Sequence, residues 1–269
     1  MELRETPDWV TGSETGIAER AAAFVTAAAY RSLADHGRFT VALAGGGTPR
    51  RLYALLAGGV DESVMTDAGY DVPFDARRSA ADARLIILPW RHTLLFQGDE
   101  RYLPANHPDS NYGMVRETLI RHICIPPQQV VRMPVESGDA ASDAERYEKL
   151  LRGIFRKPDR GTREEFPVFD LVMLGLGDDG HTASLFPEDR IALEETRRWA
   201  IAVEAPRANP PGARLTLTLP VINNAATVMF LVPEQRCELA RSIRNGEHPE
   251  LPAGRVRPVN GRLLWFVAC

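Results

Sequence analysis

The chain has 269 residues, of which 44% are hydrophobic and 25% charged, a composition typical of a globular protein with a large buried core. Its formal net charge of −4 provides no broad basic field, so we expect neither nucleic acid nor an anionic membrane as a partner. An anionic ligand would need a local group of arginines.

The cysteines and the N-terminal residues are informative about the cellular location of the protein. Cys124, Cys237 and Cys269 have no disulfide-framework spacing, which favours free thiols. The N-terminal segment MELRETPDWVTGSETG is charged and lacks the apolar core of a signal peptide, and no apolar run is long enough for a membrane span. We therefore expect a cytoplasmic protein with reduced cysteines.

The N-terminal region predicts a helix followed by a strand. Thr11 and Glu14 have capping-box spacing, and an Ala-rich helix is expected to run to about Ala34, before Gly37. Residues 39–44 (FTVALA) form a short apolar run that predicts a buried strand.

This strand leads into the glycine turn GGGTP, residues 45–49. Thr48 and Pro49 suit the N-cap and first position of a helix that continues through PRRLYALLA. Strand, glycine turn and helix in this order begin an α/β unit. Residues 58–83 then lose the periodicity and collect Gly, Asp and Ser, which predicts an insertion or lid.

The rest of the chain alternates strands and helices. We predict a strand at 93–97, a helix capped by Ser110, a helix over 141–155, a polar linker over 157–166 and a buried strand at 169–175. Later strands are predicted at 199–204, 214–219, 227–232 and 263–267. The alternation predicts a Rossmann-like α/β fold in one domain (1–269), with a mostly parallel sheet covered by helices on both faces.

Three polar clusters begin where predicted strands end. GGGTP follows the first predicted strand, GDER (98–101) follows the second, and GDDGH (177–181) follows the strand at 169–175. In open α/β sheets, ligands bind beyond the carboxyl ends of the strands. We therefore expect the three clusters to meet at one edge of the sheet.

The GGGTP segment is suited to a phosphate group. Gly46, Gly47 and Thr48 supply backbone amides, a hydroxyl and a helix N-terminus. No Gly-Lys-Ser/Thr follows, so the segment is not a Walker A loop. A tight strand-to-helix turn without a ligand is the alternative.

The segment GLGDDG (175–180) also has the Gly-x-Gly-x-x-Gly spacing of a dinucleotide-binding turn, and Glu204 ends a later strand. Asp178 and Asp179 would place two negative charges beside a pyrophosphate, and Pro187 would interrupt the helix that the motif requires. We therefore do not expect a nicotinamide cofactor.

A metal site is a further alternative, with candidate ligands Asp99, Glu100, His107, Asp109 and His181. The chain has no HExxH motif and no paired cysteines at zinc-site spacing. Carboxylates at these positions serve equally well to bind sugar hydroxyls. We therefore expect no metal.

His181 differs from the other histidines, because it lies between a glycine turn and a run of small residues, with Asp179 two positions upstream. Imidazole titrates near neutrality, so it can accept a proton from water and return it to a leaving oxygen. We interpret His181 as an acid–base residue; a structural histidine is the alternative.

Four segments together resemble the 6-phosphogluconolactonase family: GGGTPRRLY, GDERYLPANHPDSNYGM, FDLVMLGLGDDGHTASLFP and RLTLTLPVINNA. They occur in that family's order and span about residues 15–267. The related glucosamine-6-phosphate deaminases typically read HIAFNEP where this chain reads HTASLFP, and Ser-Tyr-His where it reads Ser-Asn-Tyr. Both differences favour the lactonase.

The resemblance implies a fold of the glucosamine-6-phosphate deaminase and ribose-phosphate-isomerase type. It also implies hydrolysis of 6-phospho-D-glucono-1,5-lactone to 6-phospho-D-gluconate in the oxidative pentose phosphate pathway, without cofactor or metal. His181 corresponds to the proposed general base, Asp99 and Arg101 to site residues of GDER, and Arg214 to a basic residue near the phosphate.

The candidate site therefore has two groups of residues. The catalytic candidates are His181, Asp179, as orienting partner of the imidazole, and Asp99; the substrate-binding candidates are Gly46, Gly47, Thr48, Arg101, Asn111 and Arg214. A glucosamine-6-phosphate deaminase/isomerase and a non-catalytic sugar-phosphate-binding protein are the functional alternatives. We expect a small-molecule substrate and a monomer or small homo-oligomer.

Overall fold

The computed structural model describes residues 8–155 and 166–269. The polar linker predicted over 157–166 lies outside these ranges except for its last position. Within the described ranges, no helix combines the length and apolarity needed to cross a bilayer.

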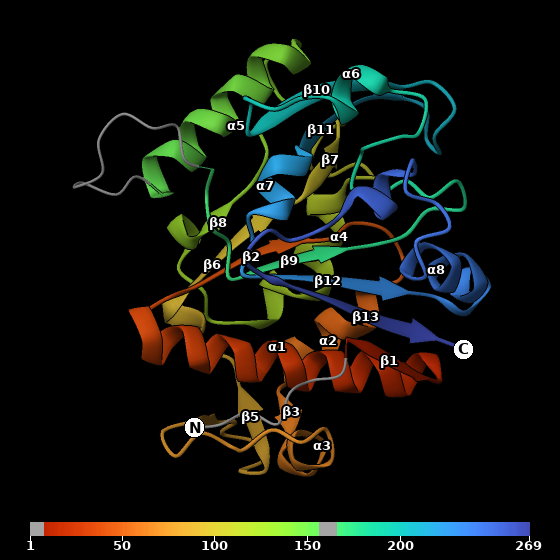
Figure 1. The fold of residues 1–269 in the computed structure, drawn as a ribbon. Coiled ribbons are helices and arrows are strands. Elements are labelled where there is room, and N and C mark those ends of the chain that lie inside the picture. Colours follow the sequence, from red (N-terminus) through yellow and green to blue (C-terminus); the bar gives the residue numbers. More distant parts are fainter. Residues whose placement is uncertain (1–7, 156–165) are drawn as a thin grey trace.

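A seven-stranded sheet, in the order β1-β13-β12-β9-β2-β6-β8, forms the centre of the molecule, and all its pairings are parallel (Figure 1). Its strands are β1 (Trp9–Gly12), β2 (Phe39–Leu43), β6 (Thr93–Gln97), β8 (Val130–Val131), β9 (Leu171–Leu174), β12 (Thr227–Val232) and β13 (Arg262–Ala268). The predicted parallel α/β fold is confirmed.

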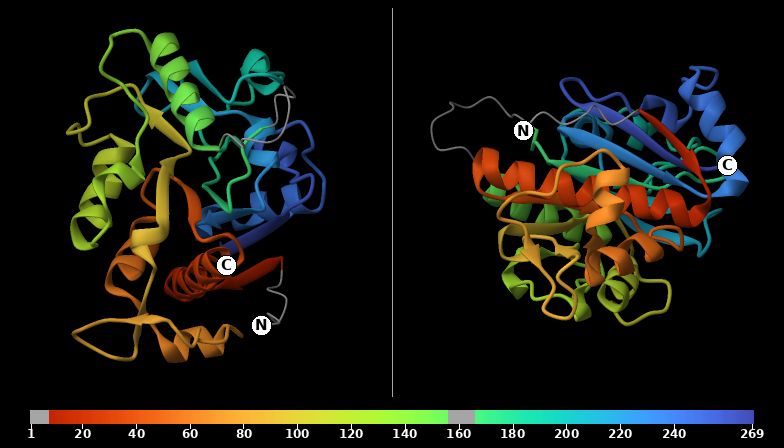
Figure 2. Two further views of the ribbon diagram at one scale, coloured as in Figure 1. Left: turned by 90° about the vertical axis from the view of Figure 1, so that its left-hand side faces the viewer. Right: turned by 90° about the horizontal axis from the view of Figure 1, so that it is seen from below.

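Each central strand is buried on both faces, which explains its nearly continuous apolar sequence. Val41 and Leu43 of β2 point into one hydrophobic core and Ala42 points into the other. The first core lies under α1 (Glu14–His36), α2 (Arg50–Gly58) and α4 (Asn111–Thr118). The second lies under α5 (Ala140–Phe155), α7 (Leu219–Asn223) and α8 (Cys237–Arg244), and Figures 1 and 2 show α1 and α5 on opposite sides of the sheet.

Two of the later predicted strands do not join the central sheet. β10 (Ala200–Ala205) and β11 (Gly212–Leu217) pair with β7 (Asp99–Arg101) in an antiparallel sheet of three strands that covers the second core. Alternation along a strand indicates how it is buried but not which strand it pairs with, so the sequence did not separate this sheet from the central one. A short helix, α6 (Arg190–Leu193), precedes β10.

Two predicted helix starts are wrong by one or two residues. Ser13, not Thr11, caps α1, and its hydroxyl accepts a hydrogen bond from the Gly16 amide at 3.1 Å, because Thr11 belongs to β1. Pro49, not Thr48, occupies the N-cap position of α2. Ser110 caps α4 as predicted.

The predicted insertion at 58–83 contains β3 (Val60–Asp61), α3 (Glu62–Asp67) and β4 (Arg77–Arg78). With β5 (Leu85–Ile87) the two strands form a small antiparallel sheet that lies beyond α1, at the bottom of Figure 1. Its apolar side chains pack into the first core. Its role as a lid stays a prediction.

The expectation of free thiols is wrong for two of the three cysteines. Cys237 begins α8 and Cys269 follows β13, and the two form a disulfide with a Cα–Cα distance of 5.7 Å, whereas Cys124 is free and exposed. β12 and β13 are parallel neighbours, so the segments that follow them emerge at the same edge of the sheet. This proximity depends on strand order, which the cysteine spacing does not reveal.

Candidate active site

Four loops meet at the carboxyl edge of the central sheet. They follow β2, β6, β9 and β12, which are consecutive in the sheet order β12-β9-β2-β6. The three clusters predicted from sequence lie on the first three of these loops and line common cavities. The fourth loop, which follows β12 and carries Arg236, was not anticipated.

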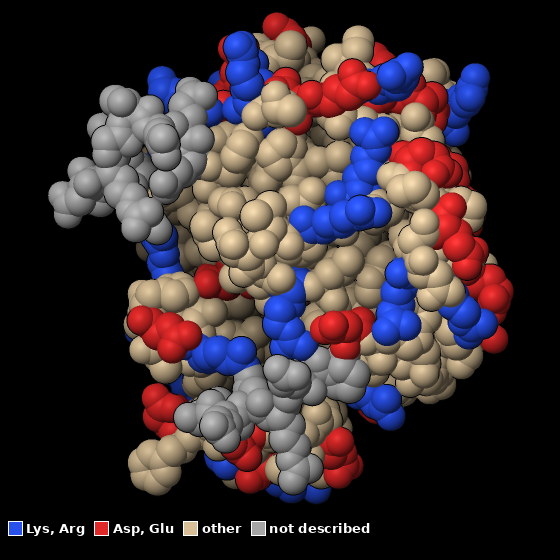
Figure 3. All heavy atoms as spheres, viewed as in Figure 1, with Lys and Arg blue, Asp and Glu red and all other residues tan. Residues whose placement is uncertain are grey.

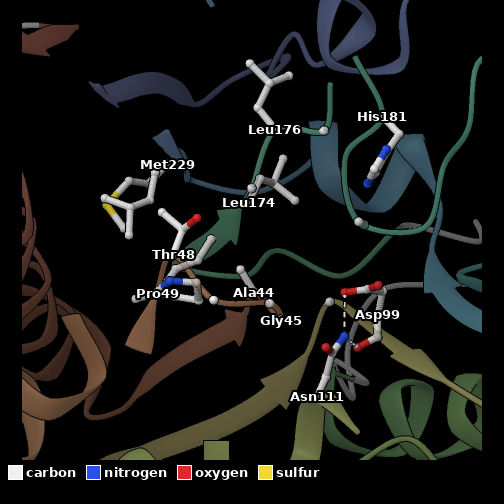
Figure 4. A pocket seen from close by; sticks show the side chains of 18 of the residues that line it. Ala44, Gly45, Thr48, Pro49, Asp99, Asn111, Leu174, Leu176, His181 and Met229 are labelled. Carbon is white, nitrogen blue, oxygen red and sulfur yellow. Dashed lines mark hydrogen bonds between the residues drawn. The ribbon is translucent and has the colours of Figure 1, made fainter. Parts of the chain in front are cut away.

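The loops enclose two adjoining cavities. The glycine compartment, of about 260 Å³, is lined by Gly46, Gly47, Thr48 and Asn111 among others (Figure 4). The arginine compartment, of about 450 Å³, is lined by Asp179, Arg207 and Arg214 among others. The residues common to both walls are Asp99, Arg101, His181, Ala183 and Arg236. A small sugar phosphate fits cavities of this size.

The His181 ring is held at the boundary of the compartments by contacts on three sides. Its Nδ1 lies 2.5 Å from Asp179 Oδ1, and the ring of Phe186 lies 4.8 Å away between centroids. A Cβ at Gly177 would lie 2.1 Å from Nδ1, so only glycine leaves room for the ring there. The described residues provide no hydrogen-bond partner for Nε2, and Figure 4 shows the ring directed into the cavity.

The two neighbouring aspartates have different partners. Asp179 Oδ1 accepts hydrogen bonds from both the ring and the backbone amide of His181. Burial raises the pKa of Asp179, but these hydrogen bonds outweigh burial and leave the pKa below its usual value. Asp178 instead pairs with Arg236, whose Nε lies 2.7 Å from Oδ1, and this hydrogen bond lowers the pKa of Asp178.

The Asp99 carboxylate is held from two directions. Asn111 Nδ2 donates to Asp99 Oδ1 at 3.2 Å and to the Asp99 carbonyl at 3.1 Å, as drawn in Figure 4. Ser184 Oγ donates to Asp99 Oδ2 at 2.7 Å. A Cβ at Gly45 would lie 2.0 Å from Asn111 Oδ1, so the amide packs directly on the glycine loop. Asn111 therefore joins the GDER segment to that loop.

Glu100, the neighbour of Asp99, points away from the compartments and organises the start of α4. Five donors reach its two carboxylate oxygens: the amides of Arg101, Asn111 and Tyr112, and the side chains of Gln97 and Ser110. Burial raises the pKa of Glu100, although the hydrogen bonds oppose that shift. Glu100 thus holds the end of β7, which carries Arg101, against the start of α4, which carries Asn111.

Arg101 and Arg214 lie opposite each other on β7 and β11. Arg214 is 4% exposed; its NH2 group donates to the Pro210 carbonyl, and its Nε has no partner among the described residues. Burial lowers the pKa of Arg214, and the charge of Arg101 adds to this effect. Two adjacent guanidinium groups with an unpaired buried donor are suited to an anionic ligand.

The predicted site residues therefore divide between the compartments. Gly46, Gly47, Thr48 and Asn111 line the glycine compartment, Arg214 and Asp179 line the arginine compartment, and His181, Asp99 and Arg101 line both. The sequence reasoning missed Arg236 and Ser184. Arg236 follows a predicted strand, a signal that could have found it, whereas no sequence signal connects Ser184 to Asp99.

The set considered as metal ligands is dispersed. His107 pairs with Asp109 at 3.7 Å, and Glu100 is occupied by backbone amides. Within the described part of the chain, no three His, Cys, Asp or Glu side chains are arranged to hold a metal ion.

Sequence comparison identifies relatives along nearly the whole chain. A family model described as glucosamine-6-phosphate isomerases/6-phosphogluconolactonase matches residues 12–265. A 6-phosphogluconolactonase of Synechocystis is 35% identical over 93% of this chain and 90% of its own length. A 6-phosphogluconolactonase of Nostoc is 33% identical over 96% of this chain and 93% of its own length.

Solved structures share the fold. The 6-phosphogluconolactonase of Trypanosoma brucei has a TM-score of 0.75 and 26% identity, covering 99% of this chain and 97% of its own. That of Thermotoga maritima has a TM-score of 0.74 and 26% identity, covering 97% and 100%. A monomeric glucosamine-6-phosphate deaminase has a TM-score of 0.68 over 97% of this chain and 96% of its own, but at 17% identity this shows the fold alone.

Proposed function

The chain belongs to the glucosamine-6-phosphate isomerase/6-phosphogluconolactonase family, and we propose that it hydrolyses 6-phospho-D-glucono-1,5-lactone to 6-phospho-D-gluconate, the lactonase step of the oxidative pentose phosphate pathway. The observation that carries this proposal is the placement of His181. Its Nδ1 is held by a carboxylate while Nε2 faces a cavity that also offers phosphate-binding groups.

The phosphate binds at the end of the site formed by the glycine loop. Gly46, Gly47 and Thr48 line this end at the start of α2, where backbone amides and the helix dipole favour an anion. Arg101 reaches both compartments, and Arg214 stands opposite it, so their guanidinium groups neutralise the dianion from the other side. Arg236 adds a further cation at the boundary.

The lactone carbonyl then lies beside His181. Nε2 takes a proton from a water molecule as the water oxygen attacks C1. The tetrahedral intermediate collapses with cleavage of the bond between C1 and the ring oxygen, and the imidazolium returns the proton to that oxygen, which becomes the C5 hydroxyl. The new carboxylic acid releases its proton to solvent.

Asp179 supports this cycle by holding the imidazole. A carboxylate accepts only from an Nδ1–H, so its hydrogen bond leaves Nε2 free to act as the base and stabilises the imidazolium that forms. The bond changes and proton transfers of this reaction balance without a cofactor or a metal.

The decisive experiment uses lactone generated freshly by enzymatic oxidation of glucose 6-phosphate. Hydrolysis releases one proton, so a pH indicator reports the rate above spontaneous hydrolysis. We expect turnover that survives a strong chelator. Ammonia release from glucosamine 6-phosphate would support a deaminase instead, and tight binding without turnover would support a sugar-phosphate-binding protein.

The proposal also includes the cellular location and the oligomeric state of the protein. We propose a cytoplasmic enzyme that is a monomer or small homo-oligomer. Size measurement by light scattering tests the assembly.

A further inference from the structure

Asp99 is the acidic side chain common to the walls of both compartments among the described residues. His181 also lines both compartments, and Figure 4 shows the Asp99 side chain below that of His181. The proton transfers of lactone hydrolysis are complete with His181 alone. The Asp99 carboxylate is therefore available for substrate recognition.

The contacts of Asp99 leave it as a fixed acceptor. An ionised carboxylate has about four positions that accept hydrogen bonds. Asn111 occupies one and Ser184 another, and both donors are buried, with exposures of 3% and 1%. Asp99 lines the cavity, so a ligand group that contacts its remaining acceptor positions must donate a hydrogen bond.

The phosphate is not that ligand group, because its oxygens accept hydrogen bonds and its charge has the same sign as that of a carboxylate. The lactone ring offers hydroxyl groups instead, and hydrogen bonds from hydroxyls to a carboxylate are about twice as strong as neutral ones. Asp99 and His181 line the same junction of the compartments, and the ring hydroxyl adjacent to the carbonyl that reacts beside His181 is the one on C2.

Ser184 connects this acceptor to the loop of the acid–base residue. It follows His181 by three residues, and the turn between them contains Ala183 with φ of 48°. The Ser184 amide donates to Thr216 Oγ1 at 3.3 Å, and Thr216 lies opposite Asp99 in the pairing of β11 with β7. One loop thus places both the imidazole and the hydroxyl that orients Asp99.

We infer that Asp99 recognises the C2 hydroxyl of the lactone and that Ser184 is the positioning residue that orients the Asp99 carboxylate for this contact. The inference rests on the proposed lactonase activity and adds a determinant of substrate specificity to it. The Ser184 hydroxyl donates to Asp99 Oδ2, so its assigned effect on the substrate passes through that carboxylate.

The test compares two substrates in each variant. One is the lactone made from glucose 6-phosphate, and the other is the lactone made in the same way from 2-deoxyglucose 6-phosphate, which lacks the C2 hydroxyl. Proton release reports both reactions, and the ratio of their kcat/KM values measures the preference for the hydroxyl. Since the same two substrates are used throughout, their different intrinsic reactivities cancel when variants are compared with the wild type.

We expect the wild type to prefer the hydroxylated lactone by about 10–100-fold. Ser184→Ala should lower this preference about three- to tenfold, with most of the change in KM for the hydroxylated substrate. Asp99→Asn should lower it further, which provides a second route if Ser184→Ala folds poorly. Thr182→Val is the matched control, because Thr182 is buried in the same loop but its hydroxyl donates to the Gly175 carbonyl.

Three results would overturn the inference: a wild-type preference near one, an unchanged preference in both Ser184→Ala and Asp99→Asn, or an equal loss of preference in Thr182→Val. No wild-type turnover of either lactone would instead overturn the proposed function. An active wild type with unaltered preference in the variants leaves the lactonase activity standing and removes only the roles of Asp99 and Ser184.

Discussion

At the scale of single residues, His181 carries the proton transfers. Its replacement by alanine removes the base while leaving the phosphate-binding groups in place. We therefore expect His181→Ala to lower kcat by about two to four orders of magnitude with little change in KM. Steady-state kinetics on fresh lactone measure both constants. His122→Ala, which alters an exposed histidine outside the compartments, is the control, and full activity in His181→Ala would remove His181 from the mechanism.

Asp179 acts on the same proton through the imidazole. Asp179→Asn replaces a charge-assisted hydrogen bond, which contributes about 1.5–3 kcal/mol, so we expect kcat to fall about 10–150-fold. A carboxyl group whose pKa is lowered by its partners contributes its favourable interaction above that pKa. The contribution is lost as the pH falls through that pKa. Because the pKa of Asp179 is lowered, its carboxylate stays charged through the neutral range, and the ratio of wild-type to variant kcat should be largest and constant on the alkaline plateau, where the imidazole base is unprotonated in both proteins.

A pH series of kcat for both proteins checks this expectation. Below the alkaline plateau the ratio should shrink, because the charged carboxylate favours the protonated imidazole in the wild type and the amide of the variant does not. Superimposable pH profiles of kcat in the two proteins would contradict an ionised Asp179 as the partner of His181.

Arg214 belongs to substrate binding rather than to the chemical step. Its guanidinium is buried beside that of Arg101, and its Nε has no partner in the part of the chain that the structure describes, so an anionic substrate gains a strong contact there. Arg214→Ala should raise KM by about 10–150-fold, the equivalent of about 1.5–3 kcal/mol, while kcat changes little. Arg190→Ala, which removes an arginine from an exposed ion pair outside both compartments, is the control. An unchanged KM in Arg214→Ala would place the phosphate elsewhere.

At the scale of elements, the loop after β9 holds the reacting group by close packing. A Cβ at Gly177 would collide with the His181 ring, so Gly177→Ala has to displace the imidazole. A displacement of about 1 Å costs roughly a hundredfold in rate, and we expect kcat to fall by about that factor. Circular dichroism and steady-state kinetics together separate this effect from unfolding. Gly153→Ala, where a Cβ meets open space in α5, should retain activity.

The strands of the central sheet were predictable because their sequences report burial directly. Residues 93–97 and 227–232 were predicted with the observed bounds of β6 and β12, since short apolar runs between polar segments leave few alternatives. The antiparallel sheet was not predictable, because β10 and β11 have the same local pattern as central strands. Their partner β7 has only three residues, all within the polar segment GDER.

The candidate site likewise has a part that was predictable from the sequence and a part that was not. The three polar clusters were grouped correctly because the carboxyl ends of parallel strands meet at one edge. Ser184 and Arg236 were missed because their partners, Asp99 and Asp178, are distant in sequence and meet them only in the folded chain. Local patterns therefore locate the loops, whereas strand order decides which side chains on them touch.

At the scale of the whole molecule, strand order also brings distant parts of the chain into covalent contact. The pairing of β12 with β13 places Cys237 beside Cys269, 32 residues apart in sequence. The closed segment includes α8, whose buried side chains belong to the core on the α5 side of the sheet. The disulfide thus fastens the element that follows Arg236 to the end of the central sheet.

Opening this disulfide should weaken the fold without removing a site residue. A cross-link of this span restricts the unfolded chain and typically contributes about 2–4 kcal/mol. We therefore expect a thiol reductant, or Cys269→Ser, to lower the free energy of unfolding in urea by about that amount. Cys124→Ser, which alters the free exposed thiol, should leave the stability unchanged. Thiol titration of the denatured chain should count one thiol before reduction and three after it; three thiols before reduction would show that the bond is absent in solution.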